Sequence, residues 1–313
     1  MSFTHLHVHT EYSLLDGVNK TTKLFERTKE LGMNAIAMTD HGMMTGLGEF
    51  WKYSKDFGIK PIIGCEIYVS PTNRSLREPV EGIKYYHLIL LAKNLTGYRN
   101  LLKIVSIGHL EGMYYKPRVD RETLEKYSEG LICTSACLAG PLSRHILRKQ
   151  YDKAEDWLGF LKGTFKEDFY LELQRHGFDG SDELSSEELS RIDSDVKEVS
   201  GEESIDTASD QKIVNIKLRE YAQKYKLPLL ATTDAHYLLK EDRDVQTILF
   251  AIKDGKLLQD DTCRTGYTGT YVASPEEMEI KFADCKEALE NTMVVADKIE
   301  AFSIAHDRVQ PKY

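Results

Sequence analysis

The stretch PIIGCEIYV, residues 61–69, places one charged side chain, Glu66, inside an otherwise apolar run. A short run that is rich in isoleucine and valine is typical of a buried β-strand. A carboxylate in such a strand needs a partner, because an isolated buried charge is costly. The stretch therefore predicts an interior strand whose carboxylate is paired or functional.

Similar short runs recur on both sides of this stretch, and segments with helical periodicity separate them. The expected strands are residues 4–8, 35–39, 61–69, 86–91, 130–134, 169–173 and 228–232. The expected helices are residues 20–31, 46–57, 96–109, 138–149, 152–165 and 212–226. Repeated strand, loop and helix units with mostly parallel strands predict an α/β protein, and seven strands favour a TIM-like barrel over a two-layer sheet.

The pattern becomes helical from Leu238 onward, which predicts a C-terminal helical extension that looks like a different module. Its expected helices are residues 242–253, 275–282 and 285–299. Ser274 and Asp284 precede the last two helices and are expected to be their N-caps.

The bulk composition predicts a globular protein. The chain has 313 residues, of which 41% are hydrophobic and 29% are charged. It contains no apolar run of about 18 residues, and its first residues lack the features of a signal peptide. Its five cysteines form no CxxC pair, which favours a reducing compartment. These features predict a soluble cytoplasmic enzyme that makes no membrane contact.

The formal net charge of −9 is concentrated in one segment. Residues 179–210 hold twelve acidic and two basic residues, so the rest of the chain is close to neutral. The charge therefore does not argue against a nucleic-acid partner for the remaining chain. The segment is also rich in serine, which predicts a solvated, disordered insertion; an acidic segment that binds a partner is the alternative.

Residues that can bind metals recur at the ends of the expected strands, where a parallel barrel places its active site. They are His7, His9, Asp16, Asp40, His41, Glu66, His87, Cys137, Asp234 and His236. Such a mixture of imidazole, carboxylate and thiol suits zinc, manganese or iron better than calcium or magnesium. Two or more close ions can bind a phosphoryl group and acidify a bound water, so the set predicts phosphoester hydrolysis.

Each candidate has a simpler explanation when it is taken alone. His7 and His9 could reflect ordinary strand alternation, Cys137 could be a small buried side chain, and Glu66 could pair with a lysine. His87 could satisfy a hydrogen bond in the core, and we expect such structural roles for His5, His109, His145 and His306. The recurrence of the candidates at strand ends, in chain order, favours a site.

Seven motifs together resemble the N-terminal PHP (polymerase and histidinol phosphatase) domain of bacterial replicative DNA polymerase III alpha subunits. The motifs are HLHVHTEYSLLDG (5–17), MTDHG (38–42), GCEIYV (64–69), YYHLILLAKNLTGYRNL (85–101), YKPRVD (115–120), GLICTSACLAG (130–140) and ATTDAHY (231–237). A generic PHP phosphatase would share only the metal motifs among them.

This resemblance implies a distorted seven-stranded (β/α)7 barrel that holds three divalent ions. One ion would lie between His7, His9, Glu66 and Asp234; a second between Glu66, His87 and Cys137; a third between Asp16, His41 and His236. It further implies 3′-to-5′ exonuclease proofreading by a metal-bound hydroxide that Asp16, Glu66 and Asp234 position. Lys116, Arg118, Arg175 and His176 are the expected contacts to phosphate or DNA.

The resemblance also implies a division of the chain and a set of partners. Residues 1–270 would form the PHP domain, and residues 271–313 would lead into a polymerase palm domain that this chain lacks. The chain would then be a fragment that does not polymerise DNA itself. The expected partners are the primer 3′ end, the remaining polymerase domains and, through them, the sliding clamp and other replisome subunits.

Two other functions remain open at this point. A stand-alone phosphatase, acting on a small ester such as histidinol phosphate, would use the same metal chemistry. A scaffold, stiffened by its metals and without hydrolysis, would need the same ligands.

Overall fold

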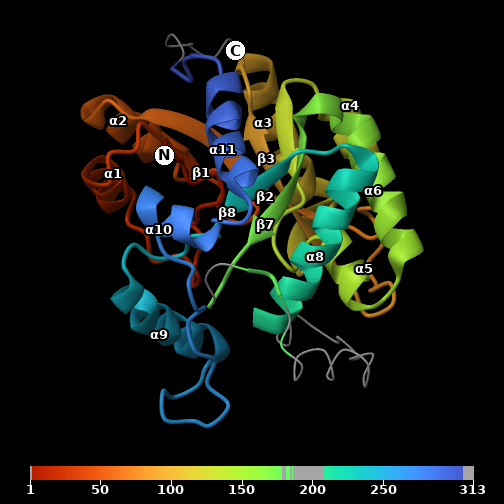
Figure 1. Ribbon diagram of the computed structural model, residues 1–313. Helices are drawn as coiled ribbons and strands as arrows, with labels where there is room; N and C mark the ends of the chain where they lie inside the picture. The colour runs from red at the N-terminus through yellow and green to blue at the C-terminus, as the bar shows by residue number, and fades with distance from the viewer. Residues whose placement is uncertain (1, 178–180, 184, 186–207, 306–313) are drawn as a thin grey trace, which may run out of the picture.

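The computed structural model describes residues 2–177, 181–183, 185 and 208–305, and shows strands surrounded by helices (Figure 1). The strands of the described residues are β1 (Ala35–Met38), β2 (Lys60–Val69), β3 (Tyr86–Ala92), β4 (Met113–Tyr114), β5 (Lys116–Val119), β6 (Leu131–Thr134), β7 (Phe169–Gln174) and β8 (Leu229–Thr232). The helices are α1 (Thr21–Glu30), α2 (Leu47–Phe57), α3 (Leu95–Glu111), α4 (Arg121–Tyr127), α5 (Pro141–Leu147), α6 (Tyr151–Phe165), α8 (Ala208–Tyr225), α9 (Arg243–Asp254), α10 (Pro275–Lys281) and α11 (Lys286–Lys298).

The sheet closes into a barrel through the N-terminal segment. Six strands pair in the order β1, β2, β3, β6, β7 and β8. Residues 4–9 join the two ends: Ala37 N donates to His5 O at 3.0 Å, and Ala235 N donates to His7 O at 3.0 Å. These contacts confirm the expected distorted seven-stranded barrel. The N-terminal segment 4–9 is not a regular strand, however, because it bends at residues 6–7. Its one β-bridge is an isolated one, between Val8 and Ala235.

The direction of β3 differs from the expectation of mostly parallel strands. β3 is antiparallel to both β2 and β6, so Tyr68 of β2 faces His87 of β3. The first residues of β3 therefore lie at the same edge of the barrel as the last residues of β2. The small hairpin of β4 and β5 was not expected from the sequence either, and β5 extends the sheet beside the end of β2.

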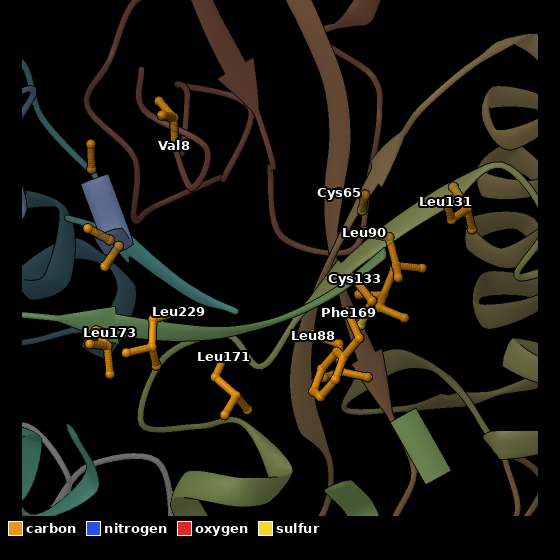
Figure 2. Close-up of a cluster of buried hydrophobic side chains, with 14 of the residues drawn as sticks. Val8, Cys65, Leu88, Leu90, Leu131, Cys133, Phe169, Leu171, Leu173 and Leu229 are labelled. Carbon is orange, nitrogen blue, oxygen red and sulfur yellow. The ribbon is translucent and has the colours of Figure 1, made fainter. Parts of the chain in front are cut away.

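The two faces of the strands have different surroundings. Leu88, Leu90, Cys133 and Phe169 gather on the outer face in Figure 2, and they belong to the large cluster that packs against the helices. The alternate residues belong to a second, smaller cluster; its strand members include Ile62, Ile89, Leu91, Ile132, Tyr170 and Leu230. Farther along the same strands the alternation continues with polar residues, among them Glu66, Thr134 and Glu172. One end of the barrel interior is therefore apolar and the other is polar.

Helix α11 closes the apolar end. It lies beside β8 (Figure 1), and its Val295, Ala296 and Ile299 belong to the smaller cluster. Lys60 Nζ also donates to Ala296 O at 2.6 Å. The expected C-terminal helices are present, but α11 packs on the barrel. Whether residues 271–313 lead into a palm domain stays a prediction.

The two expected N-caps have different outcomes. Ser274 caps α10 and forms a reciprocal capping box with Glu277, as predicted. The expectation for Asp284 was wrong, because Cys285 is the N-cap of α11. The Asp284 carboxylate instead accepts hydrogen bonds from Arg175 and Arg219, which are stronger partners than a backbone amide.

The acidic segment 179–210, expected to be disordered, lies largely outside the described residues. One described member contradicts a fully solvated segment: Asp182 is buried, and its carboxylate accepts hydrogen bonds from Arg175 and Asn215. Within the described part of the chain, no helix has the length and apolar character that crossing a membrane requires.

Candidate metal centre

The polar end of the barrel brings together the nine expected ligands. In the first group, His7 Nε2 and His9 Nε2 lie 3.0 and 3.1 Å from Asp234 Oδ1. Both ring nitrogens are 3.7 Å from the carboxylate oxygens of Glu66. The bent segment 4–9 thus places both imidazoles beside two carboxylates, Glu66 of β2 and Asp234 of the loop after β8.

The second group lies on the other side of Glu66. His87 Nδ1 is 2.8 Å from Glu66 Oε1, and Cys137 Sγ is 3.9 Å from each of these two atoms. His87 reaches this position because β3 runs opposite to its neighbours. Cys137 comes from the loop that follows β6.

The third group surrounds His41, in the loop that follows β1. Asp16 Oδ2 is 3.4 Å from His41 Nε2, and Asp16 Oδ1 is 3.5 Å from His236 Nε2. The ring of His9 lies between those of His41 and His236, with centroid distances of 4.0 and 4.3 Å. His41 Nδ1 also contacts Glu66, so Glu66 touches all three groups.

These residues fit divalent cations. Within the described residues, three sets each have ligand atoms within 4.8 Å of one another: His7, His9 and Glu66; His41, Glu66 and His87; and His9, His41 and His236. Asp234 Oδ1, Glu66 Oε2 and His87 Nε2 are buried without a hydrogen-bond partner. Buried polar atoms are normally satisfied, and buried nitrogen and oxygen atoms with unused lone pairs are what a metal site requires.

The electrostatics keep two of the candidates, Glu66 and His9, in the protonation state that a metal needs. Burial would raise the pKa of the Glu66 carboxyl, but His87 and His41 outweigh it and hold this pKa well below the usual range. Burial, reinforced by His41 and His236, lowers the pKa of His9 to about 3. Burial raises the pKa of the Cys137 thiol well above its usual value. Glu66 is therefore ionised and His9 neutral, whereas Cys137 becomes a thiolate only when a cation compensates its charge.

The backbone is strained beside three of the candidates. Leu15, Ala136 and Asp234 have positive φ angles of 57°, 58° and 49°, and the first two immediately precede Asp16 and Cys137. This left-handed conformation is unfavourable for residues other than glycine, and it persists where the surrounding structure enforces it. The surrounding structure therefore holds the backbone in an unfavourable conformation that directs these side chains.

Glu172 supports the site but was not expected from the sequence. Its Oε1 accepts a hydrogen bond from His7 Nδ1 at 2.7 Å, which leaves His7 Nε2 free to face the ligands. Thr134, Thr232 and Gln174 also donate to this carboxylate. The signal was available in the expected strand FYLEL: it holds one acid in an apolar run, as the strand of Glu66 does.

Asp40 has a similar supporting place. Its Oδ1 accepts from Ser13 Oγ at 2.7 Å, and Ser13 Oγ lies 3.0 Å from His9 Nδ1. The backbone amide and hydroxyl of Thr10 also donate to Asp40. Asp40 thus orients His9 through Ser13, and both of its carboxylate oxygens already accept hydrogen bonds from Ser13 and Thr10.

A cleft of about 730 Å³ opens over the candidate ligands. Its lining includes five basic residues: Lys116, Arg144, Arg243, Lys253 and Arg264. Of these only Lys116 was expected. Lys253 Nζ lies 3.5 Å from Asp16 Oδ2, at the third group. The spacing of Arg243, Phe250 and Lys253 places them on one face of α9, and this helical period is the signal that could have identified Lys253.

The other expected phosphate contacts lie elsewhere or have other partners. Arg118 is a correction: it is buried, and its guanidinium donates to backbone carbonyls, including Lys84 O at 3.0 Å. Arg175 is a second correction, because Asp182 and Asp284 pair with it and it does not line the cleft. His176 lines the cleft, with Nε2 3.1 Å from Thr233 O.

The histidines expected to be structural, where described, have core partners. His5 Nε2 lies 2.9 Å from Ala273 O, His109 Nε2 lies 2.8 Å from Gly42 O, and His145 lies between Tyr86 and Gln150. His306 is outside the described residues.

Comparison with known proteins identifies relatives along nearly the whole chain. Residues 5–176 match the family model of the PHP domain. The chain is 43% identical over 304 residues to DNA polymerase III subunit alpha of Borreliella burgdorferi, covering 96% of this chain and 24% of that protein. It is 40% identical over 307 residues to the subunit of the same name from Campylobacter jejuni, covering 95% and 23%. The chain thus spans about a quarter of the length of these relatives.

One of the solved structures that resemble this chain is a putative metal-dependent phosphoesterase from Bifidobacterium adolescentis. It is 11% identical, with a TM-score of 0.36, and the likeness covers 90% of this chain and 96% of that one.

Proposed function

Because this chain belongs to the PHP domain family, we propose that it is a metal-dependent phosphodiesterase that removes nucleotides from the 3′ end of DNA. The observation that carries the proposal is the convergence of nine nitrogen, oxygen and sulfur ligands, with Glu66 at their centre, at the floor of a cleft lined by basic residues. In this proposal the reaction proofreads a mispaired primer end.

The three groups of residues described above would hold three divalent ions, of zinc, manganese or iron. Bound ions would neutralise phosphate charge and make water a stronger nucleophile near neutral pH. Glu66 contacts all three groups, so it would set the spacing between ions. Glu172 and Ser13 would orient His7 and His9 and keep the nitrogens that face the cleft free.

The chain's own charges support an anionic substrate. The protein is acidic overall, yet five basic residues line the cleft. Cations gathered at one concave site attract phosphate and concentrate it there. Lys116, with a pKa lowered by burial and by nearby Lys253, is one cation of this lining that reaches toward the ligands.

The wider context is also part of the proposal. Since the relatives are DNA polymerase III alpha subunits about four times as long, we expect the chain to work beside the remaining polymerase domains and the primer 3′ end. Contact with the sliding clamp and other replisome subunits would come through those domains.

The test is release of the 3′-terminal nucleotide from a labelled primer whose end is mispaired, with manganese or zinc supplied. Asp16→Asn should lower the rate by about a hundredfold or more, since it removes a ligand of the third group. Asp56→Asn, which changes an exposed carboxylate on α2, is the matched control and should leave the rate unchanged.

One result would contradict the proposal, and two further measurements would then identify the alternative. A folded, metal-loaded protein that releases nothing would rule out the exonuclease. If it then hydrolysed a small phosphomonoester, a stand-alone phosphatase would be the better description. If it hydrolysed neither substrate while metal raised its thermal stability, the metals would serve a scaffold.

A further inference from the structure

Arg144 is a buried cation on α5 that neither the metal groups nor the fold employs. Its relative exposure is 6%, and it lines the cleft together with Cys137, Leu138 and Ala139. Arg144 lies on the helix that follows the Cys137 loop, and it lines the same cleft as Glu66, His87 and Cys137. Arg144 is therefore the cation on the side of this second metal group.

The guanidinium of Arg144 has no partner among the described residues. No carboxylate, carbonyl or aromatic ring of that part of the chain binds it, and its Nε is buried without an acceptor. Its burial also lowers its pKa, which means that the folded protein disfavours the charge. An arginine whose charge is desolvated and unpaired destabilises the fold unless a ligand supplies the missing acceptor.

The other deeply buried arginines, Arg118 and Arg175, have acceptors for their guanidinium groups within the protein. Arg118 donates to the carbonyls of Gly112, Lys84 and Leu76, and Arg175 forms ion pairs with Asp182 and Asp284. Both guanidinium groups are thus satisfied inside the protein. Arg144 differs from them in lining the open cleft, so its acceptor can come from outside.

We propose that Arg144 binds a non-bridging phosphoryl oxygen of the substrate beside the Glu66, His87 and Cys137 group. A guanidinium presents a planar set of donors that matches the oxygens of a phosphate, and such charged hydrogen bonds are strong in a buried site. The inference rests on the phosphoester chemistry proposed above and adds the residue that positions the phosphate. Lys253 lies instead beside Asp16, and Lys116 interacts with both Asp16 and Glu66. Arg144 is the cation on the helix that follows Cys137.

The test uses binding of inorganic phosphate, which is independent of hydrolysis. Phosphate is titrated calorimetrically into the manganese-loaded protein, and the Kd is compared with that of Arg144→Met. The substitution should weaken binding by about ten- to a hundredfold, the effect of losing charged hydrogen bonds. Arg148→Met, just beyond the same helix, is the control: Arg148 donates to Glu81 O, does not line the cleft, and should retain the wild-type Kd.

A second measurement separates binding from folding. In the metal-free, phosphate-free protein, Arg144→Met should unfold at the same or a higher urea concentration than wild type, because it removes an unpaired charge. A structural arginine would give the opposite result. Lower urea resistance combined with an unchanged phosphate Kd would overturn the proposal, as would a metal-loaded wild type that binds no phosphate.

The two proposals can fail separately. Phosphate binding that depends on Arg144, in a protein that releases no nucleotide, would retain this inference and reject the exonuclease. Nucleotide release that is equally fast in wild type and in Arg144→Met, with equal KM, would retain the exonuclease and reject this inference.

Discussion

At the scale of single residues, the site depends on two interior carboxylates with different tasks. Glu66 has an oxygen without a hydrogen-bond donor and lies within reach of the ligand histidines. Glu172 is instead saturated by Thr134, Thr232, Gln174 and His7. The first is thus free to bind an ion, and the second is committed to orienting a ligand.

Glu172→Gln should weaken metal binding without unfolding the protein. Burial opposes ionisation of Glu172, but His7 and the hydroxyl donors lower its pKa, so the native group is a carboxylate that makes His7 a better ligand. The neutral amide should lower metal affinity by about ten- to a hundredfold, the usual effect of losing such a support. Competition with a fluorescent chelator measures the affinity.

Glu155→Gln is the control for this change, since Glu155 pairs with Lys224 on the surface. If Glu172→Gln bound metal as tightly as wild type, Glu172 would only be filling space in the interior.

At the scale of secondary-structure elements, the direction of one strand decides where a ligand lies. In a parallel barrel, His87 at the start of its strand would lie at the edge opposite to the carboxyl ends. Because β3 is antiparallel to β2, His87 faces Tyr68 near the end of β2 and reaches Glu66. The loop after β6 adds Cys137 at the same edge.

Three elements are joined beside the barrel by one ion-pair network. Arg175 follows β7, Arg219 lies on α8, and Asp284 precedes α11. Asp284 thus connects the C-terminal helix to the barrel wall through two arginines.

This network should make the free energy of unfolding of the wild-type protein depend on pH below about 4. Burial would raise the pKa of Asp284, but Arg175 and Arg219 lower it from 3.8 to about 2. A depressed carboxyl pKa contributes stability that is full above the unfolded value and is lost as pH falls toward the folded value. Asp284→Asn should therefore cost roughly 1 kcal/mol at neutral pH, a figure reduced for partial exposure, and nothing near pH 2.

Urea unfolding of both proteins from pH 7 to pH 2, in the presence of a chelator, measures this difference. Asp156→Asn changes an exposed partner of Arg121 and serves as the control, with a small effect. A wild-type advantage that persisted at pH 2 would mean that Asp284 stabilises the protein by packing.

At the scale of the whole molecule, the candidate ligands come from positions 7 to 236 and from seven separate segments. An ion bound between them would connect the N-terminal segment 4–9, the strand ends and the loop after β8. Such a site exists only in the folded chain, so the free energy of binding adds to the free energy of unfolding.

Removing metal should therefore lower the thermal stability. With metal at about a hundred times its Kd, the ligand contributes about 3 kcal/mol, so a chelator should lower Tm by about 5 to 10 °C. Differential scanning calorimetry with and without chelator measures the change.

Glu66→Gln provides the control at this scale, because it removes the carboxylate common to the three groups and should abolish the dependence on metal. A wild-type Tm that was the same with and without bound metal would exclude coupling between this site and the fold.

The sequence by itself determined the barrel, six of its seven strands within a few residues, and the set of candidate ligands. Strands and their ends are local features: apolar runs alternate with turns, and a buried carboxylate such as Glu66 stands out within a run. The α4 helix and the β4–β5 hairpin could not be predicted because their sequence patterns are short. The reversal of β3 could not be predicted because the periodicity of a strand is the same in either direction.

Only the tertiary structure decided which charged side chains face the cleft. The sequence predicts phosphate contacts at Arg118 and Arg175, yet internal acceptors satisfy both. Arg144 and Lys253 belong to no motif of the sequence, yet both line the cleft. The sequence shows that an arginine is charged, but the partners that neutralise it come from distant segments. The availability of a charge for a substrate is therefore a property of packing, and it appears only when the whole chain has folded.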